Sequence, residues 1–349
     1  MNTVVVTGAA GFVGMYVVRD FVRAGWEVIA VVHRSRPAEL RTLADRGAVT
    51  LVAADLTEAG DFERALGEAG VADRAAVLVH CAARVTDVGR DVRFRAANYD
   101  AVEHLVHWCL AHTGCRLVHV STTDVYGCRD GRGRTEEELP YARGRLNPYP
   151  KYKIRAERLI RDRLPRRRYV ILRPGSIWGV GDRLVAPRIV AFLRNSRFIV
   201  CFGRHAGRNR WPLSHVRNVS AAAALAAVDS NVPGQAITVV DPECSRLVDA
   251  FRMFAEVYLP GKRLRVLPLP CFVMFPLTVL NEWICRWTDR NVPLFDPTTY
   301  TLRLSACDRD YAVDRFVNLL ARHGRVPVSR DEGMRELMAD RRSGGRLSP

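Results

Sequence analysis

Short apolar runs alternate with longer segments of helical periodicity along the first 175 residues. The apolar runs are rich in Val, Leu and Ile and lack alternating polar positions, as is typical of strands buried on both faces. They are Thr3–Val6, Glu27–Val32, Val49–Ala53, Ala76–His80, Leu117–Ser121 and Tyr169–Leu172. The helical segments between them are Phe12–Ala24, Phe62–Ala69, Tyr99–His112 and Tyr149–Leu164. This alternation predicts an α/β fold with a doubly wound parallel sheet of the Rossmann type.

The alternation becomes less regular after Pro174. Helices are expected at Pro187–Arg194 and Val219–Val228, and one further strand at Ala236–Val240. We therefore expect a dinucleotide-binding Rossmann domain over residues 1–175. A smaller C-terminal substrate-binding lobe is expected over residues 176–340, interwoven with the end of the sheet. Residues 341–349 are expected to form a flexible tail.

A stretch without any charged residue, Val266–Asn281, lies in the C-terminal third. Its 16 residues are too few for a membrane-spanning helix, which needs about 20. Three prolines within it would also break such a helix. The next segment, NEWICRWTDR, places two tryptophans beside charged residues, as interfacial anchors do. Two interpretations stay open: an apolar helix of the substrate lobe, or a peripheral membrane contact through residues 266–287.

The formal net charge of +16 raises the question of a polyanionic partner. Only three of the 53 basic residues are lysines (Lys151, Lys153 and Lys262), and the arginines are spread along the whole chain. A skew of this size indicates a codon bias rather than selection for phosphate contacts. We therefore expect solvated surface charge and no nucleic-acid partner.

The nine cysteines include no CxxC pair, and the chain begins with an apolar strand rather than with a basic segment followed by a long apolar one. These features indicate reduced thiols and no export signal. We expect an intracellular protein that is cytoplasmic or peripherally associated with a membrane. No metal ligand set is expected.

The first strand leads into a glycine-rich turn, Thr7-Gly8-Ala-Ala-Gly11-Phe12-Val13-Gly14, and then into a helix. Gly8 allows a tight turn out of the strand, and Gly11 allows the backbone to approach a pyrophosphate at the helix N-terminus. Gly14 allows the helix to pack closely on the strand. This context predicts a dinucleotide site that includes Gly8, Gly11, Phe12, Val13 and Gly14.

Two further segments are candidates for the same site. Asp55, which is followed by Leu56, comes after the third strand, where a carboxylate can accept a hydrogen bond from the adenine amino group. The alternative is that Asp55 caps a helix ahead of Glu58. Ala82 and Ala83 follow the fourth strand, and their small side chains leave room for a cofactor.

A Tyr-x-x-x-Lys spacing places Tyr149 and Lys153 on one face of a predicted helix. A nearby ammonium favours the phenolate, so we expect Lys153 to lower the pKa of Tyr149 and make it an acid or base near neutral pH. Tyr152 does not repeat the spacing, because Ala156 follows it four residues later. Thr122, at the end of the fifth strand, offers a hydroxyl to a substrate oxygen.

These motifs together resemble the extended short-chain dehydrogenase/reductase family over about residues 1–240. The segments that carry the resemblance are TGAAGFVG, Asp55, HCAA, Asn98, STTDVYG, YPKYK and RPGSIWGVGD. The resemblance implies that Thr122 binds the substrate oxygen and that Tyr149 is the acid/base, with Lys153 as its partner. It also implies a supporting role for Asn98 and a position of Arg173-Pro174-Gly175 beside the nicotinamide.

The C-terminal third is similar to the 3β-hydroxysteroid dehydrogenase/Δ5–4 isomerase group. The similar segments are Trp211-Pro-Leu-Ser-His-Val-Arg-Asn-Val and Tyr300-Thr-Leu-Arg-Leu-Ser followed by Tyr311-Ala-Val. The resemblance implies oxidation of a 3β-hydroxyl by hydride transfer to NAD(P), followed by a shift of the double bond from Δ5 to Δ4. The apolar stretch Leu264–Leu280 suits a steroid-like substrate, and a homodimer is expected.

Two other functions stay open. The first is an NAD(P)-dependent sugar-nucleotide epimerase, dehydratase or reductase that uses the same Thr122, Tyr149 and Lys153. The second is a non-enzymatic, cofactor-sensing protein, although such a protein would not need these three side chains.

The end of the second strand departs from the pattern of the steroid group. It reads His33-Arg34-Ser35-Arg36, where an acid would bind the adenosine ribose and disfavour NADP. Arg34 and Arg36, with His33 beside them, can instead bind a 2′-phosphate through charge-assisted hydrogen bonds. We therefore expect NADP(H) to be accepted at least as well as NAD(H).

Overall fold

Seven parallel strands form the central sheet of the computed structural model, which describes residues 2–144, 146–288, 290, 293–345 and 347. Their order is β12-β7-β5-β4-β1-β2-β3, so the chain winds outward in both directions from the adjacent strands β1 and β4. The strands are β1 (Thr3–Thr7), β2 (Glu27–Val32), β3 (Val49–Ala53), β4 (Ala75–His80), β5 (Arg116–Val120), β7 (Tyr169–Pro174) and β12 (Ala236–Val239). This is the arrangement of a doubly wound Rossmann-type sheet, and the predicted fold class is confirmed.

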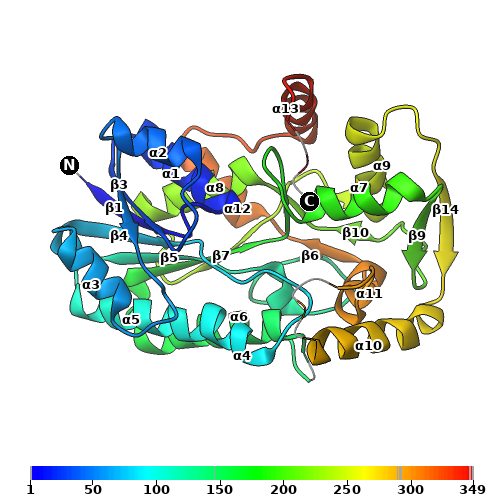
Figure 1. Cartoon of the computed structure of the whole chain (residues 1–349), viewed down its shortest axis with the longest axis horizontal. Helices are drawn as coiled ribbons and strands as arrows, with labels where there is room; N and C mark the ends of the chain where they lie inside the picture. Colours follow the sequence, from blue (N-terminus) through cyan, green and yellow to red (C-terminus); the bar gives the residue numbers. More distant parts are fainter. Residues whose placement is uncertain (1, 145, 289, 291–292, 346, 348–349) are drawn as a thin grey trace.

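Helices cover both faces of this sheet (Figure 1). One face carries α1 (Phe12–Arg23), α2 (Ala38–Asp45), α8 (Val216–Val228) and α12 (Asp314–Arg322). The other carries α3 (Asp61–Glu68), α5 (Ala101–Ala111) and α6 (Pro148–Arg163). Along β1, Val4 and Val6 are buried under the first set of helices and Val5 under the second. Burial on both faces explains why the strands read as continuous apolar runs.

Residues beyond 175 return to the sheet and also build a lobe beside the carboxyl ends of its strands (Figure 1). Strand β12 and helices α8 and α12 belong to the sheet and its covering layer. The other helices are α7 (Val185–Asn195), α9 (Leu247–Tyr258), α10 (Cys271–Trp287), α11 (Thr299–Ala306) and α13 (Arg330–Arg342). The other strands are β6 (Gly131–Arg134), β8 (Ser176–Trp178), β9 (Phe198–Phe202), β10 (Arg210–Trp211), β11 (Leu213–His215), β13 (Ser245–Arg246), β14 (Arg265–Leu269) and β15 (Arg309–Tyr311).

The helix predicted over Tyr99–His112 begins earlier and contains a wide turn. Helix α4 (Asp91–Arg95) continues into a π-helical turn over Ala96–Asp100 before α5 begins. Asn98 therefore lies inside a continuous helical segment rather than at the start of a helix. Turns of this type occur frequently at functional sites.

The uncharged stretch 266–281 forms a strand and the first part of a helix. Strand β14 pairs in parallel with β9, and α10 begins after Pro270. Pro276 lies inside α10 without ending it. The missing N–H of Pro276 leaves the carbonyl of Phe272 without its helical partner, but both residues are exposed and water can reach that carbonyl.

The tail expected from residue 341 begins later. Helix α13 extends to Arg342, and the side chain of Arg341 donates a hydrogen bond to the carbonyl of Val257. The N–H of Gly345 then bonds the carbonyl of Asp340 at 2.9 Å. Within the predicted tail, residues 346, 348 and 349 lie outside the described residues.

Candidate active site

The β1–α1 turn lies against the loop that follows β4, at the point where the strand order reverses. Gly8 has a φ of 68°, and a Cβ on it would lie 2.6 Å from the backbone nitrogen of Ala82. A Cβ on Gly14 would lie 2.1 Å from the carbonyl oxygen of Gly8. Only glycine fits at these two positions, so strand, turn and helix meet as closely as a dinucleotide site requires.

The N-terminus of α1 is available to a ligand at this turn. Gly11 is the N-cap and offers no side chain to the N–H groups of the first helical turn. Phe12 and Val13, the first two helical residues, are half-buried. N–H groups at a helix N-terminus attract phosphate oxygens. The turn therefore fits the pyrophosphate of a nicotinamide dinucleotide.

The end of β2 carries the residues expected at the adenosine end of a cofactor. His33, Arg34 and Arg36 are all exposed. Neither arginine has a side-chain hydrogen bond or ion pair with any residue that the structure describes. The Nδ1 atom of His33 lies 3.4 Å from Oδ2 of Asp55. This edge of the site thus presents two unpaired guanidinium groups beside one carboxylate.

Asp55 closes a turn and does not cap a helix. Its Oδ1 accepts hydrogen bonds from the N–H of Thr57 at 3.0 Å and from the Thr57 hydroxyl at 2.7 Å. Helix α3 begins only at Asp61, with Gly60 as its N-cap, so the N-cap alternative for Asp55 is wrong. Burial raises the pKa of Asp55, but the Thr57 bonds outweigh it and lower the pKa below its usual value. The carbonyl of the next residue, Leu56, lies 3.0 Å from Nδ1 of His104.

The end of β5 and the first turn of α6 bring the two expected catalytic hydroxyls together. The Thr122 hydroxyl lies close enough to the Tyr149 phenol to lower the pKa of Tyr149. Oδ1 of Asn147 accepts the N–H of Tyr149 at 3.0 Å, and Nδ2 of Asn147 donates to the carbonyl of Asp87 at 2.8 Å. The N-cap of α6 therefore fixes Tyr149, which is only 9% exposed, at the carboxyl edge of the sheet.

Lys153 lies one turn further along α6, and its ammonium is directed at the sheet. Its Nζ donates to the carbonyl of Val120 at 2.8 Å. Burial lowers the pKa of Lys153 to about 8, although the charge of Glu157 opposes this change. Two buried histidines near this ammonium, His80 and His119, are stacked with ring centroids 5.3 Å apart. Burial lowers the pKa of His80 to about 3, so this ring is neutral.

The expectation that Lys153 lowers the pKa of Tyr149 is wrong for this arrangement. Burial and then the carboxylate of Asp124 raise the pKa of Tyr149, and the nearby Thr122 hydroxyl only partly opposes them. The Lys153 ammonium is engaged with Val120 instead. Tyr149 is therefore a neutral phenol at pH 7.

Asp124 is a site residue that the motifs alone did not reveal. Its N–H donates to Oγ1 of Thr122 at 3.2 Å, and its carboxylate accepts hydrogen bonds from the hydroxyl of Tyr300 and, at 3.1 Å, from Nη1 of Arg309. Tyr300 lies in α11 and Arg309 begins β15, so the lobe reaches the catalytic end of β5 through this carboxylate. No local pattern signals these contacts, because Tyr300 is 176 residues away from Asp124 in sequence.

A buried ion pair, also missed, supports the same strand end. The side chains of Glu157 on α6 and Arg173 on β7 are 0% and 4% exposed. Glu157 also accepts hydrogen bonds from Ser121 at 2.5 Å and from Tyr141 at 2.8 Å. Burial raises the pKa of Glu157, but the charge of Arg173 outweighs it and lowers the pKa. Its position four residues after Lys153, on the same helix face, was the available signal.

Other predicted residues lie along the same edge of the sheet. Ala82 and Ala83 follow β4, and Asn98 holds this loop: its Oδ1 accepts the N–H of Arg84 at 2.8 Å, and its Nδ2 donates to the Arg84 carbonyl at 3.0 Å. Pro174 ends β7. Asn98 thus fixes the backbone of the loop that follows β4.

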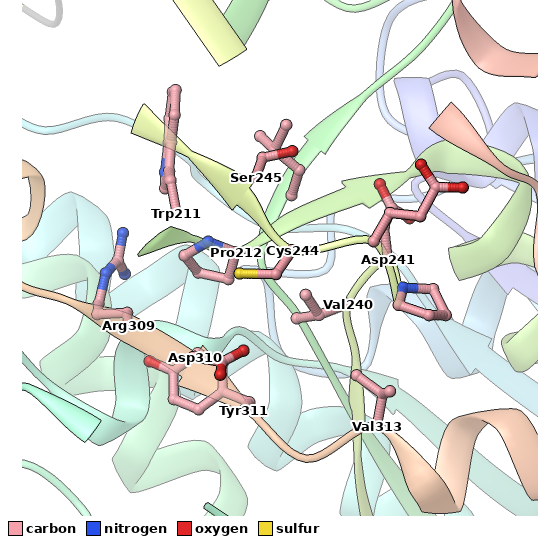
Figure 2. A pocket seen from close by; sticks show the side chains of 13 residues that line it. Trp211, Pro212, Val240, Asp241, Cys244, Ser245, Arg309, Asp310, Tyr311 and Val313 are labelled. Carbon is pink, nitrogen blue, oxygen red and sulfur yellow. The ribbon is translucent and has the colours of Figure 1, made fainter. Parts of the chain in front are cut away.

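A small pocket is lined in part by Arg309 and Tyr311 (Figure 2). Its volume is about 30 Å³, and Trp211, Asp241 and Cys244 are among the residues that line it. A cavity of this size holds one or two water molecules. It is too small for a sterol or a sugar nucleotide and does not include Thr122 or Tyr149.

Comparison with known proteins identifies the family. The model of the NAD-dependent epimerase/dehydratase family matches residues 4–239, which include the glycine turn, Thr122, Tyr149 and Lys153. The chain belongs to this family. It is an oxidoreductase of the extended short-chain dehydrogenase/reductase type and uses a nicotinamide cofactor. The resemblance inferred from the motifs is confirmed.

Relatives of this family member differ in substrate. It is 24% identical over 348 residues, with 97% of each chain covered, to a decarboxylating sterol-4-alpha-carboxylate 3-dehydrogenase of Schizosaccharomyces pombe. It is 26% identical over 262 residues, 73% of this chain and 69% of the relative, to a 3 beta-hydroxysteroid dehydrogenase/Delta 5-->4-isomerase of Mycobacterium tuberculosis. A solved dTDP-glucose 4,6-dehydratase of Bacillus anthracis in complex with NAD has a TM-score of 0.71 at 17% identity, with 98% and 97% of the two chains covered. This last likeness shows a shared fold.

Proposed function

We propose that this chain is an NAD(P)-dependent dehydrogenase that interconverts the 3β-hydroxyl and 3-keto groups of a sterol-like substrate. The observation that carries the proposal is the pair of buried side chains, Thr122 and Tyr149, that lie close together at the carboxyl end of β5. This pair lies on the same edge of the sheet as the glycine turn.

In this proposal Thr122 holds the substrate oxygen and Tyr149 exchanges its proton. A nicotinamide dinucleotide, when bound, accepts or supplies the hydride at the carbon that carries this oxygen. In oxidation the Tyr149 oxygen takes the hydroxyl proton, and in reduction the phenol returns it. Burial and Asp124 keep the pKa of Tyr149 high, so the phenol is protonated near neutral pH and reduction of the ketone is favoured there. Oxidation of the hydroxyl needs the phenolate, so its rate increases as the pH rises.

Two lines of support favour a sterol-like substrate. Two relatives, of which the chain covers 97% and 69%, are named for a sterol and for a steroid. The C-terminal lobe also contains the long uncharged stretch 266–281, which suits a substrate that is mainly hydrocarbon. The second candidate function, conversion of a sugar nucleotide, is supported by the shared fold with the dTDP-glucose 4,6-dehydratase.

The deciding experiment measures both reduction of NAD and NADP and conversion of the substrate by the purified protein, because an epimerase or a dehydratase returns the hydride and accumulates no NADH. A 3β-hydroxy-Δ5 steroid is supplied in one series and UDP- and GDP-sugars in another, with Tyr149→Phe as the blank. Turnover of the steroid alone supports the proposal, whereas turnover of a sugar nucleotide alone overturns it. If the steroid is oxidised, the ultraviolet absorbance of a conjugated enone reports the proposed shift of the double bond to Δ4. The proposed homodimer is tested by light scattering on the same preparation.

A further inference from the structure

Helix α10 buries polar side chains and exposes apolar ones, the reverse of an ordinary surface helix. Its buried positions include Thr278, Asn281 and Cys285. Nδ2 of Asn281 donates to the carbonyl of Phe295 at 2.8 Å, and Oδ1 of Asn281 accepts the N–H of Leu294 at 3.0 Å. The polar groups of this helix are therefore satisfied on its inner side.

The outer side of α10 is apolar and uncovered. Phe272, Trp283 and Trp287 are 76%, 62% and 77% exposed. More than half of the large exposed apolar side chains that the structure describes lie between residues 266 and 295. On α10 they are Phe272, Val273, Phe275, Leu277, Val279, Leu280, Trp283 and Trp287. A patch of this size marks an interaction site rather than an ordinary surface. We call these eight residues the α10 patch.

The charges around the α10 patch are mainly basic. The exposed arginines near it in the chain are Arg263, Arg265, Arg286, Arg290 and Arg303. Arg303 lies over the ring of Phe275, with 5.6 Å from its Cζ to the ring centroid. Between residues 263 and 303 the described acidic residues are fewer: Glu282, which accepts the N–H of Thr299 at 2.8 Å, and Asp296. Asp296 is paired with Arg188.

The patch has the features of a helix that lies in a lipid interface. No helix among the described residues is long and apolar enough to cross a bilayer. The indoles of Trp283 and Trp287 are parallel, with centroids 6.3 Å apart, at the end of the helix where the arginines begin. Tryptophan is enriched at the boundary between hydrocarbon and headgroups, and basic residues attract anionic headgroups.

We propose that α10 docks this chain onto an anionic bilayer surface, with the helix axis in the membrane plane and the α10 patch inserted among the lipids. A second copy of the chain is a poorer occupant, because two identical faces surrounded by arginine repel each other. Helix α10 runs along the outer edge of the lobe (Figure 1). If the substrate is the sterol-like one proposed above, this docking places the lobe next to the phase in which that substrate dissolves.

The test is flotation of the full-length protein with two kinds of vesicle, phosphatidylcholine alone and phosphatidylcholine with phosphatidylglycerol. We expect binding to the anionic vesicles that falls at least tenfold in Phe272→Ser/Leu280→Ser/Trp283→Ser. The matched control, Leu110→Ser/Val228→Ser/Val326→Ser, changes exposed apolar residues elsewhere and leaves binding unchanged. Arg265→Gln/Arg286→Gln/Arg303→Gln is expected to remove the preference for anionic vesicles, whereas Arg46→Gln/Arg163→Gln/Arg325→Gln is not.

The position of the helix is read from tryptophan fluorescence with brominated lipids. We expect quenching in the wild type that is lost in Trp283→Phe/Trp287→Phe. Absence of vesicle binding, or equal binding by the wild type and the triple serine variant, overturns the proposal. A solution mass that halves in the serine variant without vesicles also overturns it, in favour of a contact between two copies. These readouts require no turnover, so an inactive protein that binds vesicles contradicts only the proposed function.

Discussion

The cofactor turn and the catalytic end of β5 are assembled in different ways. The turn is closed by residues that are close in sequence, Gly8 to Gly14, with one contact to Ala82. The catalytic end instead depends on Asp124, which is held by Tyr300 and Arg309 from the lobe. The glycine turn is therefore determined by residues close together in sequence. The surroundings of Tyr149, in contrast, depend on groups of the lobe that are distant in sequence.

The largest effect is expected from a substitution of Tyr149, beside the end of β5. Tyr149→Phe removes the proton-transfer group, so turnover should fall by about 10²–10⁴-fold, while the affinity for the cofactor measured by titration stays the same. Tyr152→Phe is the matched control, because the Tyr152 hydroxyl bonds Asp91 and has no part in the proposed mechanism. Turnover of the Tyr149 variant within twofold of the wild type would contradict the assignment.

The next effect concerns the buried pair beneath this strand end. Glu157→Gln leaves Arg173 as an uncompensated buried charge and should reduce the free energy of unfolding by about 3 kcal/mol, measured by urea denaturation. Glu39→Gln, which breaks the exposed pair with Arg19, should cost less than about 1 kcal/mol.

The same pair makes stability depend on pH. Because the folded-state pKa of Glu157 is lowered, its contribution is complete above the ordinary glutamate pKa and is lost as the pH falls through the lower, folded-state value. The Gln variant should therefore show a flatter loss of stability in acid. An equal acid dependence of both proteins would show that Glu157 is not the group responsible.

The third prediction concerns the packing of the cofactor turn. A methyl group at Gly14 would lie 2.1 Å from the Gly8 carbonyl oxygen, so Gly14→Ala should distort the turn. A cost of about 1–3 kcal/mol is typical of such overpacking, and the Kd for the cofactor should rise by about ten- to a hundredfold. Gly67→Ala is the control, because a Cβ there meets nothing within 4 Å. Unchanged cofactor affinity in Gly14→Ala would contradict the local assembly of this site.

A smaller effect is expected at the end of β2. Arg34→Ala/Arg36→Ala should weaken NADP binding about tenfold, since one partly exposed charge-assisted hydrogen bond is worth about 1.4 kcal/mol. The Kd for NAD should change little. The control Arg41→Ala/Arg46→Ala changes two other exposed arginines nearby in the chain. A wild-type preference for NAD that the double variant does not alter would rule out the 2′-phosphate role.

The smallest effect is a displacement of the pH profile. Asp124 raises the pKa of Tyr149, so Asp124→Asn should move the midpoint of the pH dependence of oxidation toward lower pH. Tyr300→Phe keeps the carboxylate and should not produce this downward shift. An unmoved midpoint in Asp124→Asn would show that the lobe positions this residue for another reason.

Much of this molecule could be predicted from its sequence because the relevant physics is local. Strands buried on both faces have continuous apolar runs, and the predicted strands at Glu27–Val32 and Val49–Ala53 match β2 and β3. The meeting of Thr122 with Tyr149 follows from a strand end and a helix start that face each other across a parallel sheet. In such cases spacing along the chain determines proximity in space.

The remaining features depend on tertiary contacts that no spacing reveals. The direction of the Lys153 ammonium depends on the carbonyl of Val120, and the high pKa of Tyr149 depends on burial and on Asp124. Periodicity shows where the apolar residues of α10 lie but not which face is covered. The outward direction of Phe272 and Trp283 appears only when the bonds of Asn281 are known.

The wide turn at Ala96–Asp100 has a consequence for how this segment can change during evolution. Such a turn holds one residue more than an α-helical path of the same length would, so deleting one residue there would restore a regular helix. Helix α5 would keep Val102 and Leu105 packed under the sheet, but the wide turn that directs Asn98 at Arg84 would be lost. We therefore expect chains that lack this extra residue to have a redesigned loop after β4, rather than a simple gap in the alignment.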